Sequence, residues 1–205
     1  PLMRRALAID EASFGSNHPR VAVQLNNLAL LLQATNRQGE AEPLMRYALA
    51  IDEASFGADH PKVAFLLNNL ATQLYDTNRM SEAEPLMRRA LAIDEASLGA
   101  DHPNVARGLN NLATLLQATN RLAEAEPLMR RVLAIVETAF GVEHPNVAIC
   151  LNNLAQLLQD TNRLGEAEPL MCRALGINEA FFGADHPNVA TILNNLATLL
   201  QGTKR

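Results

Sequence analysis

The sequence predicts an all-α fold, a solenoid of about ten helices packed as antiparallel pairs. The pairs His-Pro and Asn-Asn each recur five times at steps of 42 residues, beginning at His18-Pro19 and Asn26-Asn27. Within every repeat the hydrophobic residues follow the spacing of α-helices, and short polar turns separate the helical stretches. A repeat period of about 20–50 residues is typical of solenoids, whose units bury their hydrophobic faces only against their neighbours.

The first helix of each repeat, here called the A helix, is predicted over residues 19–34 in the first full copy. Pro19 fits its first turn, where a missing N–H has no helical partner to lose. Asn36 follows the helix and can adopt the left-handed conformation that ends many helices. The spacing i, i+4, i+7, i+8, i+11 predicts a buried stripe of Val21, Leu25, Leu28, Ala29 and Leu32.

The second helix of each repeat, the B helix, is predicted to begin near Glu40 and to end at Gly57. Glu40 and Glu42 are expected in its first turn, where negative charge is favourable to the helix dipole. Pro43 falls close enough to the start to be tolerated. The predicted apolar face consists of Ala41, Leu44, Met45, Ala48, Leu49 and Ile51.

The repeats predict one solenoid domain over residues 1–205. Full units fall near 19–57, 61–99, 103–141 and 145–183, and half units fall at 1–15 and 187–205. Short turns between the A and B helices force each pair into an antiparallel hairpin. Because the chain opens at Pro1 in mid-pattern and without a methionine, we expect the true N-terminus to be missing.

The composition argues against nucleic acid and membrane as partners. Charged residues make up 19% of the chain and the net charge is −5, whereas a nucleic-acid binder needs a basic surface. Neither an apolar run of about 18–20 residues nor a signal-peptide pattern is visible. Cys150 and Cys172 lack metal-ligand spacing and fit two packed thiols in a reducing compartment. We therefore predict a cytoplasmic protein without a disulfide.

The sequence predicts no enzyme, no cofactor and no metal site. Each histidine stands at the start of an A helix, one repeat from the next, so the five cannot converge on one ion. Paired carboxylates such as Glu40 and Glu42 recur at every B-helix start, which the helix dipole explains. No glycine-rich phosphate loop or nucleophile motif is present. The methionine series from Met3 to Met171 is expected to pack in the core.

The motifs Leu-Asn-Asn-Leu-Ala and Glu-Ala-Glu-Pro-Leu-Met-Arg-Arg-Ala-Leu-Ala-Ile-Asp-Glu-Ala resemble the tetratricopeptide repeats of kinesin light chains and of long bacterial arrays with the same 42-residue period. The resemblance covers the whole chain. Leu25 falls where many such repeats carry tryptophan, Leu28 and Ala29 match the Leu-Gly pair, and Ala41 and Ala48 match the two alanines of helix B. The resemblance implies a right-handed superhelix, with A helices lining its concave side, that binds proteins or peptides. The chain shows no heptad coiled coil, which favours a bacterial relative over a motor subunit.

The A helix is predicted to present one face to a binding groove. With Leu25 at the centre of the buried stripe and about 100° per residue, positions 23, 27, 30 and 34 fall on the opposite face. Only the asparagine is the same in every copy. The predicted groove residues are the repeated Asn27, Asn69, Asn111, Asn153 and Asn195, together with Val23, Leu30, Phe65, Thr72, Asp76, Arg107, Thr114, Ile149, Gln156 and Asp160.

The repeated asparagine has two interpretations. A carboxamide both donates and accepts, so a row of them can hold the backbone of an extended peptide while variable neighbours select its side chains. The resemblance supports this, because asparagines at this position contact peptide backbone in that family. Alternatively, Asn27 and its equivalents bond to neighbouring helices. For the first asparagine of each pair, the Asn26 series at the edge of the stripe, we expect a hydrogen-bond ladder between repeats.

The predicted groove differs in charge from the kinesin light chain pattern, which implies acidic cargo. Only Arg107 is basic, whereas Asp76 and Asp160 are acidic. Val23, Leu30 and Phe65 make the N-terminal end of the groove more apolar, and we expect aliphatic or aromatic partner side chains there. An alternative function is a sensor or spacer arm of a larger signalling protein, packed on its own partner domains.

The two terminal helices are predicted to expose complementary apolar faces. The A helix at 187–201 exposes parts of Leu193, Leu196 and Leu200, and the first B helix exposes parts of Leu2, Met3, Leu7 and Ile9. Every internal repeat packs an A helix against a B helix. We therefore predict that chains associate head to tail through these helices.

Overall fold

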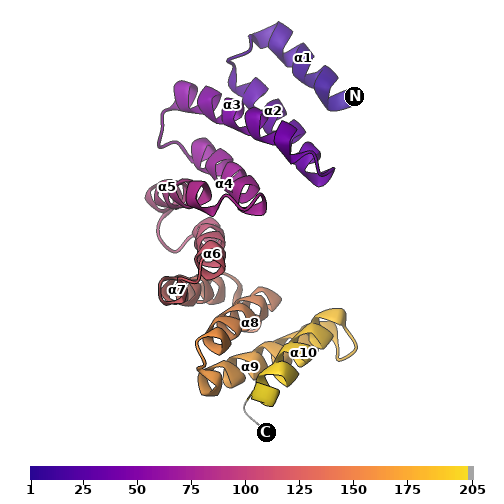
Figure 1. Cartoon of the computed structure of the whole chain (residues 1–205), viewed down its shortest axis with the longest axis vertical. Coiled ribbons are helices and arrows are strands. Elements are labelled where there is room, and N and C mark those ends of the chain that lie inside the picture. The colour runs from indigo at the N-terminus through magenta and orange to yellow at the C-terminus, as the bar shows by residue number, and fades with distance from the viewer. Residues whose placement is uncertain (203–205) are drawn as a thin grey trace. The chain divides into compact units, whose positions relative to one another are not determined.

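The computed structural model describes residues 1–202, which form ten helices and no strand (Figure 1). The predicted all-α fold is confirmed. The helices are α1 (Leu2–Phe14), α2 (Pro19–Ala34), α3 (Gln38–Phe56), α4 (Pro61–Asp76), α5 (Met80–Leu98), α6 (Pro103–Ala118), α7 (Leu122–Phe140), α8 (Pro145–Asp160), α9 (Leu164–Phe182) and α10 (Pro187–Gly202). The A helices are the even-numbered ones and the B helices the odd-numbered ones. The helices fall into two compact units, Pro1–Ala100 with α1–α5 and a second unit that begins at Asp101 with α6–α10.

Each A helix begins in the same way, with a histidine followed by a proline. The Nδ1 atom of His18 accepts a hydrogen bond from the backbone N–H of Arg20 at 3.2 Å. His60, His102, His144 and His186 accept the equivalent bond at 3.1–3.2 Å. Such a cap satisfies one of the N–H groups that lack a partner at a helix start. The prediction that the histidines mark helix starts is confirmed.

The turns from A to B helices use a left-handed asparagine, as predicted. Asn36, Asn78, Asn120 and Asn162 have φ between 58° and 61°. The residue that follows donates its backbone N–H into the last turn of the A helix, as Arg37 does to the carbonyl of Leu32 at 2.8 Å. The chain therefore reverses direction within three residues.

The B helix starts two residues earlier than predicted, at Gln38 in α3. Glu40 lies in the first turn, but Glu42 does not. Glu42 instead pairs with Arg46 at 2.9 Å and with Arg79 of the next repeat at 2.6 Å. Burial alone would raise the pKa of Glu42, but the hydrogen bonds from both arginines outweigh it and lower that pKa. Glu40 therefore lies in the first turn as predicted, where it also pairs with Arg37 at 2.7 Å, whereas Glu42 links two repeats.

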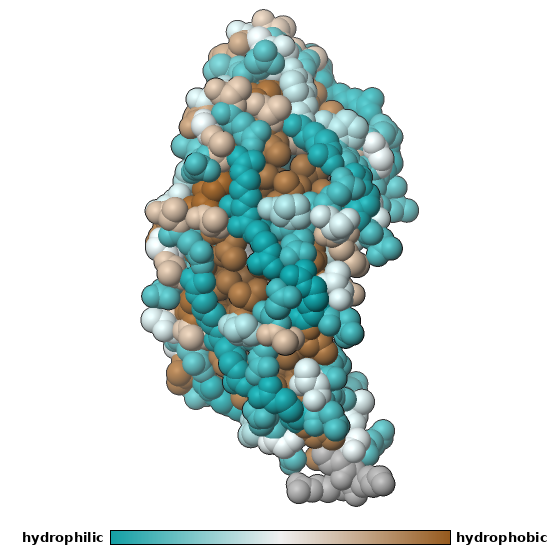
Figure 2. All heavy atoms as spheres, turned by 60° about the vertical axis from the view of Figure 1, so that its left-hand side comes forward, coloured by the Kyte–Doolittle hydropathy of each residue, from teal (hydrophilic) through white to brown (hydrophobic). Residues whose placement is uncertain are grey.

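The predicted stripes form the core between the helices. In α2 the stripe residues are at most 6% exposed: Val21, Leu25, Leu28, Ala29 and Leu32. In α3, Ala41, Met45, Ala48 and Ile51 are buried, while Leu44 and Leu49 are half-buried. Pro43 lies inside α3 without ending it. On the face seen in Figure 2, hydrophobic residues lie in the seams between hydrophilic ridges.

The terminal helices expose apolar side chains, as expected from their single neighbours. On α1, Leu2 and Ile9 are 82% and 55% exposed, Met3 is also exposed, and Leu7 is half-buried. Met3 therefore departs from the buried methionine series, whose other members lie in the core. On α10, Leu193 is exposed, and Leu196 and Leu200 are half-buried. Head-to-tail association through these faces stays a prediction.

Both cysteines are free, as predicted. Cys150 is half-buried in α8, and burial raises the pKa of its thiol to about 11. Cys172 is exposed on α9.

In the described residues, no helix is both long and apolar enough to cross a membrane.

Candidate functional site

The predicted groove residues all reach the surface of the A helices, and together they are called the A face. Val23, Phe65 and Ile149 are 55%, 45% and 56% exposed, and Leu30 is also exposed. The remaining variable residues are exposed as well: Thr72, Asp76, Arg107, Thr114, Gln156 and Asp160. Asn27 is exposed, and its equivalents are half-buried: Asn69, Asn111, Asn153 and Asn195. The A face therefore combines large exposed apolar side chains with a repeated carboxamide.

Two of the repeated asparagines bond to the preceding A helix. The Nδ2 group of Asn69 donates to Oδ1 of Asn26 at 3.0 Å, and that of Asn195 donates to Oδ1 of Asn152 at 2.9 Å. The predicted ladder of the Asn26 series thus exists at these two places, with the second asparagine of the next repeat as donor. Each bond uses one N–H of a carboxamide that has two N–H groups and an acceptor oxygen. Contact of these residues with a peptide stays a prediction.

Three pockets open between successive A helices, and each is named after the buried residue that its B helix contributes. The Asp52 pocket lies between α2 and α4, the Val136 pocket between α6 and α8, and the Asn178 pocket between α8 and α10. Their volumes are about 340, 320 and 160 Å³. Ligand pockets typically measure ~300–1,000 Å³, so the Asp52 and Val136 pockets lie at the small end of that range and the Asn178 pocket lies below it.

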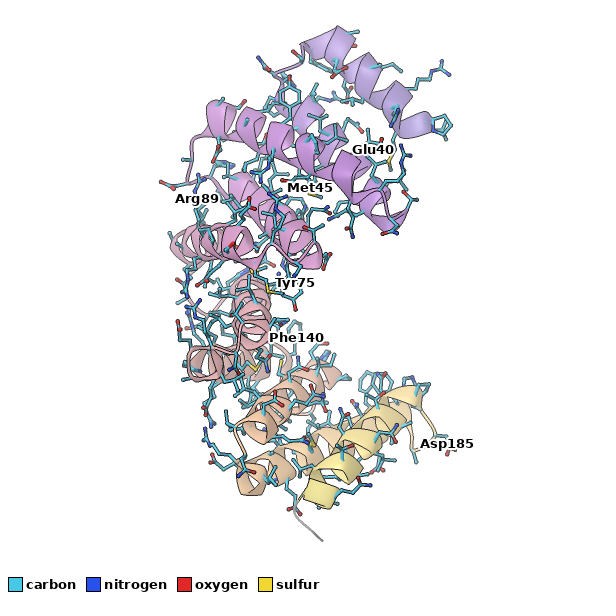
Figure 3. The ribbon with its side chains drawn as sticks, in the orientation of Figure 1. Glu40, Met45, Tyr75, Arg89, Phe140 and Asp185 are labelled. Carbon is cyan, nitrogen blue, oxygen red and sulfur yellow. The ribbon has the colours of Figure 1, made fainter. Side chains whose placement is uncertain are left out.

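The pockets share one construction. The Asp52 pocket is lined by Ala22, Val23, Asn26, Asn27, Asp52, Pro61, Lys62, Phe65 and Leu66. The Val136 pocket is lined by Pro103, Ala106, Arg107, Asn110, Val132, Val136, Phe140, Asn146, Ile149, Cys150 and Asn153. The Asn178 pocket is lined by Ala148, Ile149, Asn152, Asn178, Asn188, Thr191 and Ile192. Phe140, labelled in Figure 3, is the last residue of α7. Residues at the same positions of the repeat recur in all three, but their chemistry differs.

The residue at the base of each pocket was missed by the sequence reasoning. It belongs to a B helix, and it lies on the buried face because it follows Ile51 and stands four residues after Ala48. Across the five copies this position holds Asp10, Asp52, Asp94, Val136 and Asn178. The sequence did carry a signal for this position. An aspartate interrupts the apolar face of the B helix in the first three copies, and valine or asparagine replaces it in the last two.

Asp52 has an unusual environment. Its side chain is 4% exposed, and its Oδ1 atom is buried with no hydrogen-bond partner among residues 1–202. Burial raises the pKa of the carboxyl group, although the charges of Lys62 and His60 partly oppose this. The Nζ atom of Lys62 lies 4.2 Å from the ring centre of Phe56, over the ring face. The carboxyl group that lines this pocket therefore carries a buried acceptor without a partner in the described residues.

Metal ligands do not gather in the part of the chain that the structure describes. No group of three or more His, Cys, Asp or Glu side chains there could hold a metal ion. The histidines instead accept the helix-capping bonds described above, and four of their rings stack on phenylalanine rings.

Comparison with known proteins agrees with this repeated construction. A sequence profile of the tetratricopeptide repeat matches residues 1–54, 40–96, 62–138 and 105–180. The chain belongs to the tetratricopeptide repeat family. No curated protein matches the chain in sequence.

Solved tetratricopeptide structures share the fold. A protein of Podosopora anserina, assigned as a kinesin light chain with nearly identical TPR-like repeats, is 25% identical with a TM-score of 0.81, over 91% of this chain and 89% of that chain. BtubC (BKLC) of P. vanneervenii is 22% identical with a TM-score of 0.81, and the match covers 98% of this chain and 79% of that chain. Aspartyl phosphate phosphatase F of Bacillus subtilis is 14% identical with a TM-score of 0.75, and the match covers 91% of this chain and 47% of that chain. These similarities confirm that the tetratricopeptide repeats form a kinesin light chain-like solenoid.

Proposed function

We propose that the chain is a protein-binding scaffold that holds an extended peptide along its A face. The observation that carries this proposal is the set of pockets between successive A helices, in which a constant frame presents different chemistry in each repeat. The repeated asparagine would hold the peptide backbone, and the pockets would take its side chains. Exposed apolar residues such as Val23 and Phe65 support this role, because contiguous exposed apolar surface marks interaction sites.

The fold supports the same proposal. Tetratricopeptide repeats stack into elongated arrays whose binding surfaces run along many repeats. An extended peptide suits such a surface, since backbone contacts can repeat while side chains differ. The kinesin light chain resemblance implies an acidic cargo, but the charges of this A face differ. The proposed ligand would meet apolar side chains, two carboxylates (Asp76 and Asp160) and one basic side chain (Arg107).

The proposed function is tested by selecting peptides from a random display library on the full chain. Changing Asn69, Asn111 and Asn153 to Ala should weaken the selected peptides by roughly 0.5–1.5 kcal/mol per lost hydrogen bond, measured by isothermal titration calorimetry. Unchanged affinity, or a peptide mapped to the B helices by NMR, would contradict the proposal.

One control separates binding from packing. Asn26→Ala removes the same inter-helix bond as Asn69→Ala but keeps the Asn69 side chain. Because Asn26 also lines the Asp52 pocket, the comparison uses peptides with alanine at the residue that would enter that pocket. If both variants weaken a peptide equally, the Asn69 amide acts only through packing. Circular dichroism establishes that each variant stays helical.

The alternative role, a sensor or spacer arm, would place a domain of the same polypeptide on the A face. Such a domain, expressed separately, would compete with the selected peptides for binding. The cytoplasmic location stays a prediction.

A further inference from the structure

The repeat contains two carboxylates in equivalent positions with different surroundings. Asp10 of α1 accepts a hydrogen bond at Oδ2 from Nε2 of Gln24 in α2, at 3.1 Å. Asp52 of α3 is the same residue one repeat later, but Leu66 of α4 stands where α2 has Gln24. Leucine cannot donate a hydrogen bond, and Oδ1 of Asp52 has no partner within the described residues. The donor that serves Asp10 is therefore absent from the copy that contains Asp52.

An unpartnered buried carboxylate favours a cation. Removing Asp52 from water already weakens the folded state, so an entering cation adds only the cost of its own desolvation. A charge-assisted hydrogen bond to a carboxylate is about twice as strong as a neutral one. The large exposed apolar side chains that line this pocket are Val23 of α2 and Phe65 of α4, so a partner from solvent would meet them.

The walls of the pocket fit the rest of a long basic side chain. Val23 and Phe65 are both about half exposed at the surface, while Leu66 and Ala22 are buried beneath them. Lysine and arginine carry aliphatic stems that pack against such surfaces while the charged end reaches a polar group. A volume of about 340 Å³ accommodates such a side chain.

From this arrangement we infer that the Asp52 pocket binds the cationic end of a lysine or arginine side chain of the bound peptide. The inference rests on the proposed function and names the chemistry of one subsite. The equivalent Val136 and Asn178 pockets carry no carboxylate at this position, and they serve as internal comparisons.

Lys62 is the one basic side chain that lines the Asp52 pocket, and it is the internal competitor for the carboxylate. In the structure its Nζ atom lies over the Phe56 ring, 4.2 Å from the ring centre, which keeps its charge at an aromatic face. Its positive charge near the pocket should weaken a basic ligand. The equivalent positions in later repeats hold asparagine, at Asn104, Asn146 and Asn188. Lys62→Asn is therefore a variant that the repeat itself tolerates.

The first test uses n-butylguanidinium as an analogue of the arginine side chain, with 1-pentanol as a neutral comparison. Methyl NMR signals of Val23 and Leu66 report on the pocket. We expect saturable shifts with n-butylguanidinium that are absent, or weaker by about tenfold or more, in Asp52→Val. The same loss, read from the Val23 methyl signals alone, is expected in Leu66→Gln, which supplies the donor that Asp10 has. Equal shifts with 1-pentanol, or shifts that persist in Asp52→Val, would overturn the inference.

The variants are matched to residues already present in the chain. Val136 and Asn178 occupy the position of Asp52 in later repeats, so Asp52→Val and Asp52→Asn should both fold, as circular dichroism will check. Lys62→Asn should bind n-butylguanidinium more tightly. If only Lys62→Asn binds it and the native chain does not, Lys62 occupies the carboxylate and the inference is wrong for the native protein.

The second test distinguishes this inference from the proposed function. Peptides selected from the display library by the native chain should be enriched in lysine or arginine at one position, and Asp52→Val should lose that enrichment. Selected peptides without such enrichment would overturn the inference and leave the proposed function standing. Failure to select any peptide would remove the proposed function, while the n-butylguanidinium titration still tests the chemistry of the pocket.

Discussion

The ring of His60 lies 4.7 Å from the ring of Phe56, with the two planes 24° apart. His60 also accepts the hydrogen bond that caps α4. Its equivalent His102 caps α6 but follows Leu98 in place of a phenylalanine. The capping bond and the ring contact are therefore separable within one chain.

Replacing the capping histidines should reveal this difference. His102→Ala removes only the cap and should lower the free energy of unfolding by about 0.5–2 kcal/mol. His60→Ala also removes the stacked ring, which adds about 0.5–1.5 kcal/mol. Urea denaturation followed by circular dichroism measures both losses. His60→Asn keeps a capping acceptor and should lose only the contribution of the stacked ring. Equal losses of unfolding free energy in His60→Ala and His102→Ala would contradict this account.

Asp52 should make stability depend on pH in an unusual direction. Because burial raises its pKa in the folded state, the folded chain binds a proton more tightly than the unfolded chain does. Stability should therefore fall as pH rises from the ordinary aspartate pKa of 3.8 through the raised value. The groups that oppose the shift are Lys62 and His60 of the neighbouring repeat.

Asp52→Asn checks this sign. The variant removes a buried, partly unsatisfied charge and should be more stable than the native chain at about pH 7, by roughly 1–3 kcal/mol. The gain should disappear at about pH 3, where the native carboxyl group is protonated. Urea denaturation at both pH values measures the difference. A constant difference across this range would show that Asp52 does not titrate with a raised pKa.

The two thiols should react at different rates. Burial raises the pKa of Cys150 to about 11 from 9.0, which lowers its thiolate fraction near neutral pH by about a hundredfold. Cys172 is exposed. In the folded chain we expect a thiol reagent to modify Cys172 rapidly and Cys150 slowly, with two thiols titrating after unfolding. Mass spectrometry of the partly labelled protein assigns the sites, and a total of zero would indicate a disulfide.

The exposed faces of α1 and α10 should promote head-to-tail association. Leu193 of α10 is exposed, and Leu2 and Ile9 of α1 are exposed at the other end. Light scattering should show a mass that rises with concentration for the native chain. Leu193→Glu should abolish the rise without loss of helix, because this side chain lies at the surface. A mass independent of concentration in the native chain would show this prediction to be wrong.

The sequence predicted the helices well because local residues determine their ends. Pro19 and Asn36 mark the start and end of α2, and the stripe from Val21 to Leu32 is buried as its spacing requires. The start of α3 was two residues off, since neither Gln38 nor Gly39 carries a start signal. Helix boundaries without a capping side chain are weakly determined by sequence.

The candidate site was predicted only in part. Exposure of the A face followed from helical spacing, as for Val23 and Phe65. The Asp52 pocket did not, because it joins residues of three helices and depends on which side chain of α4 faces the carboxylate. The sequence shows that Gln24 is replaced by Leu66 one repeat later. That this replacement removes a hydrogen-bond donor from an aspartate becomes apparent only when the packing of each A helix on the preceding B helix is known.

Each pocket takes its residues from three consecutive helices, and the frame around it repeats every 42 residues. Insertion or deletion of one whole repeat would change the chain by 42 residues. Such an event keeps every histidine cap and every left-handed asparagine turn in phase, so the fold is retained. What changes is the order and number of the residues at the bases of the pockets. A protein of this kind can therefore change the sequence of chemical environments along its A face by rearranging whole repeats, without a single point mutation.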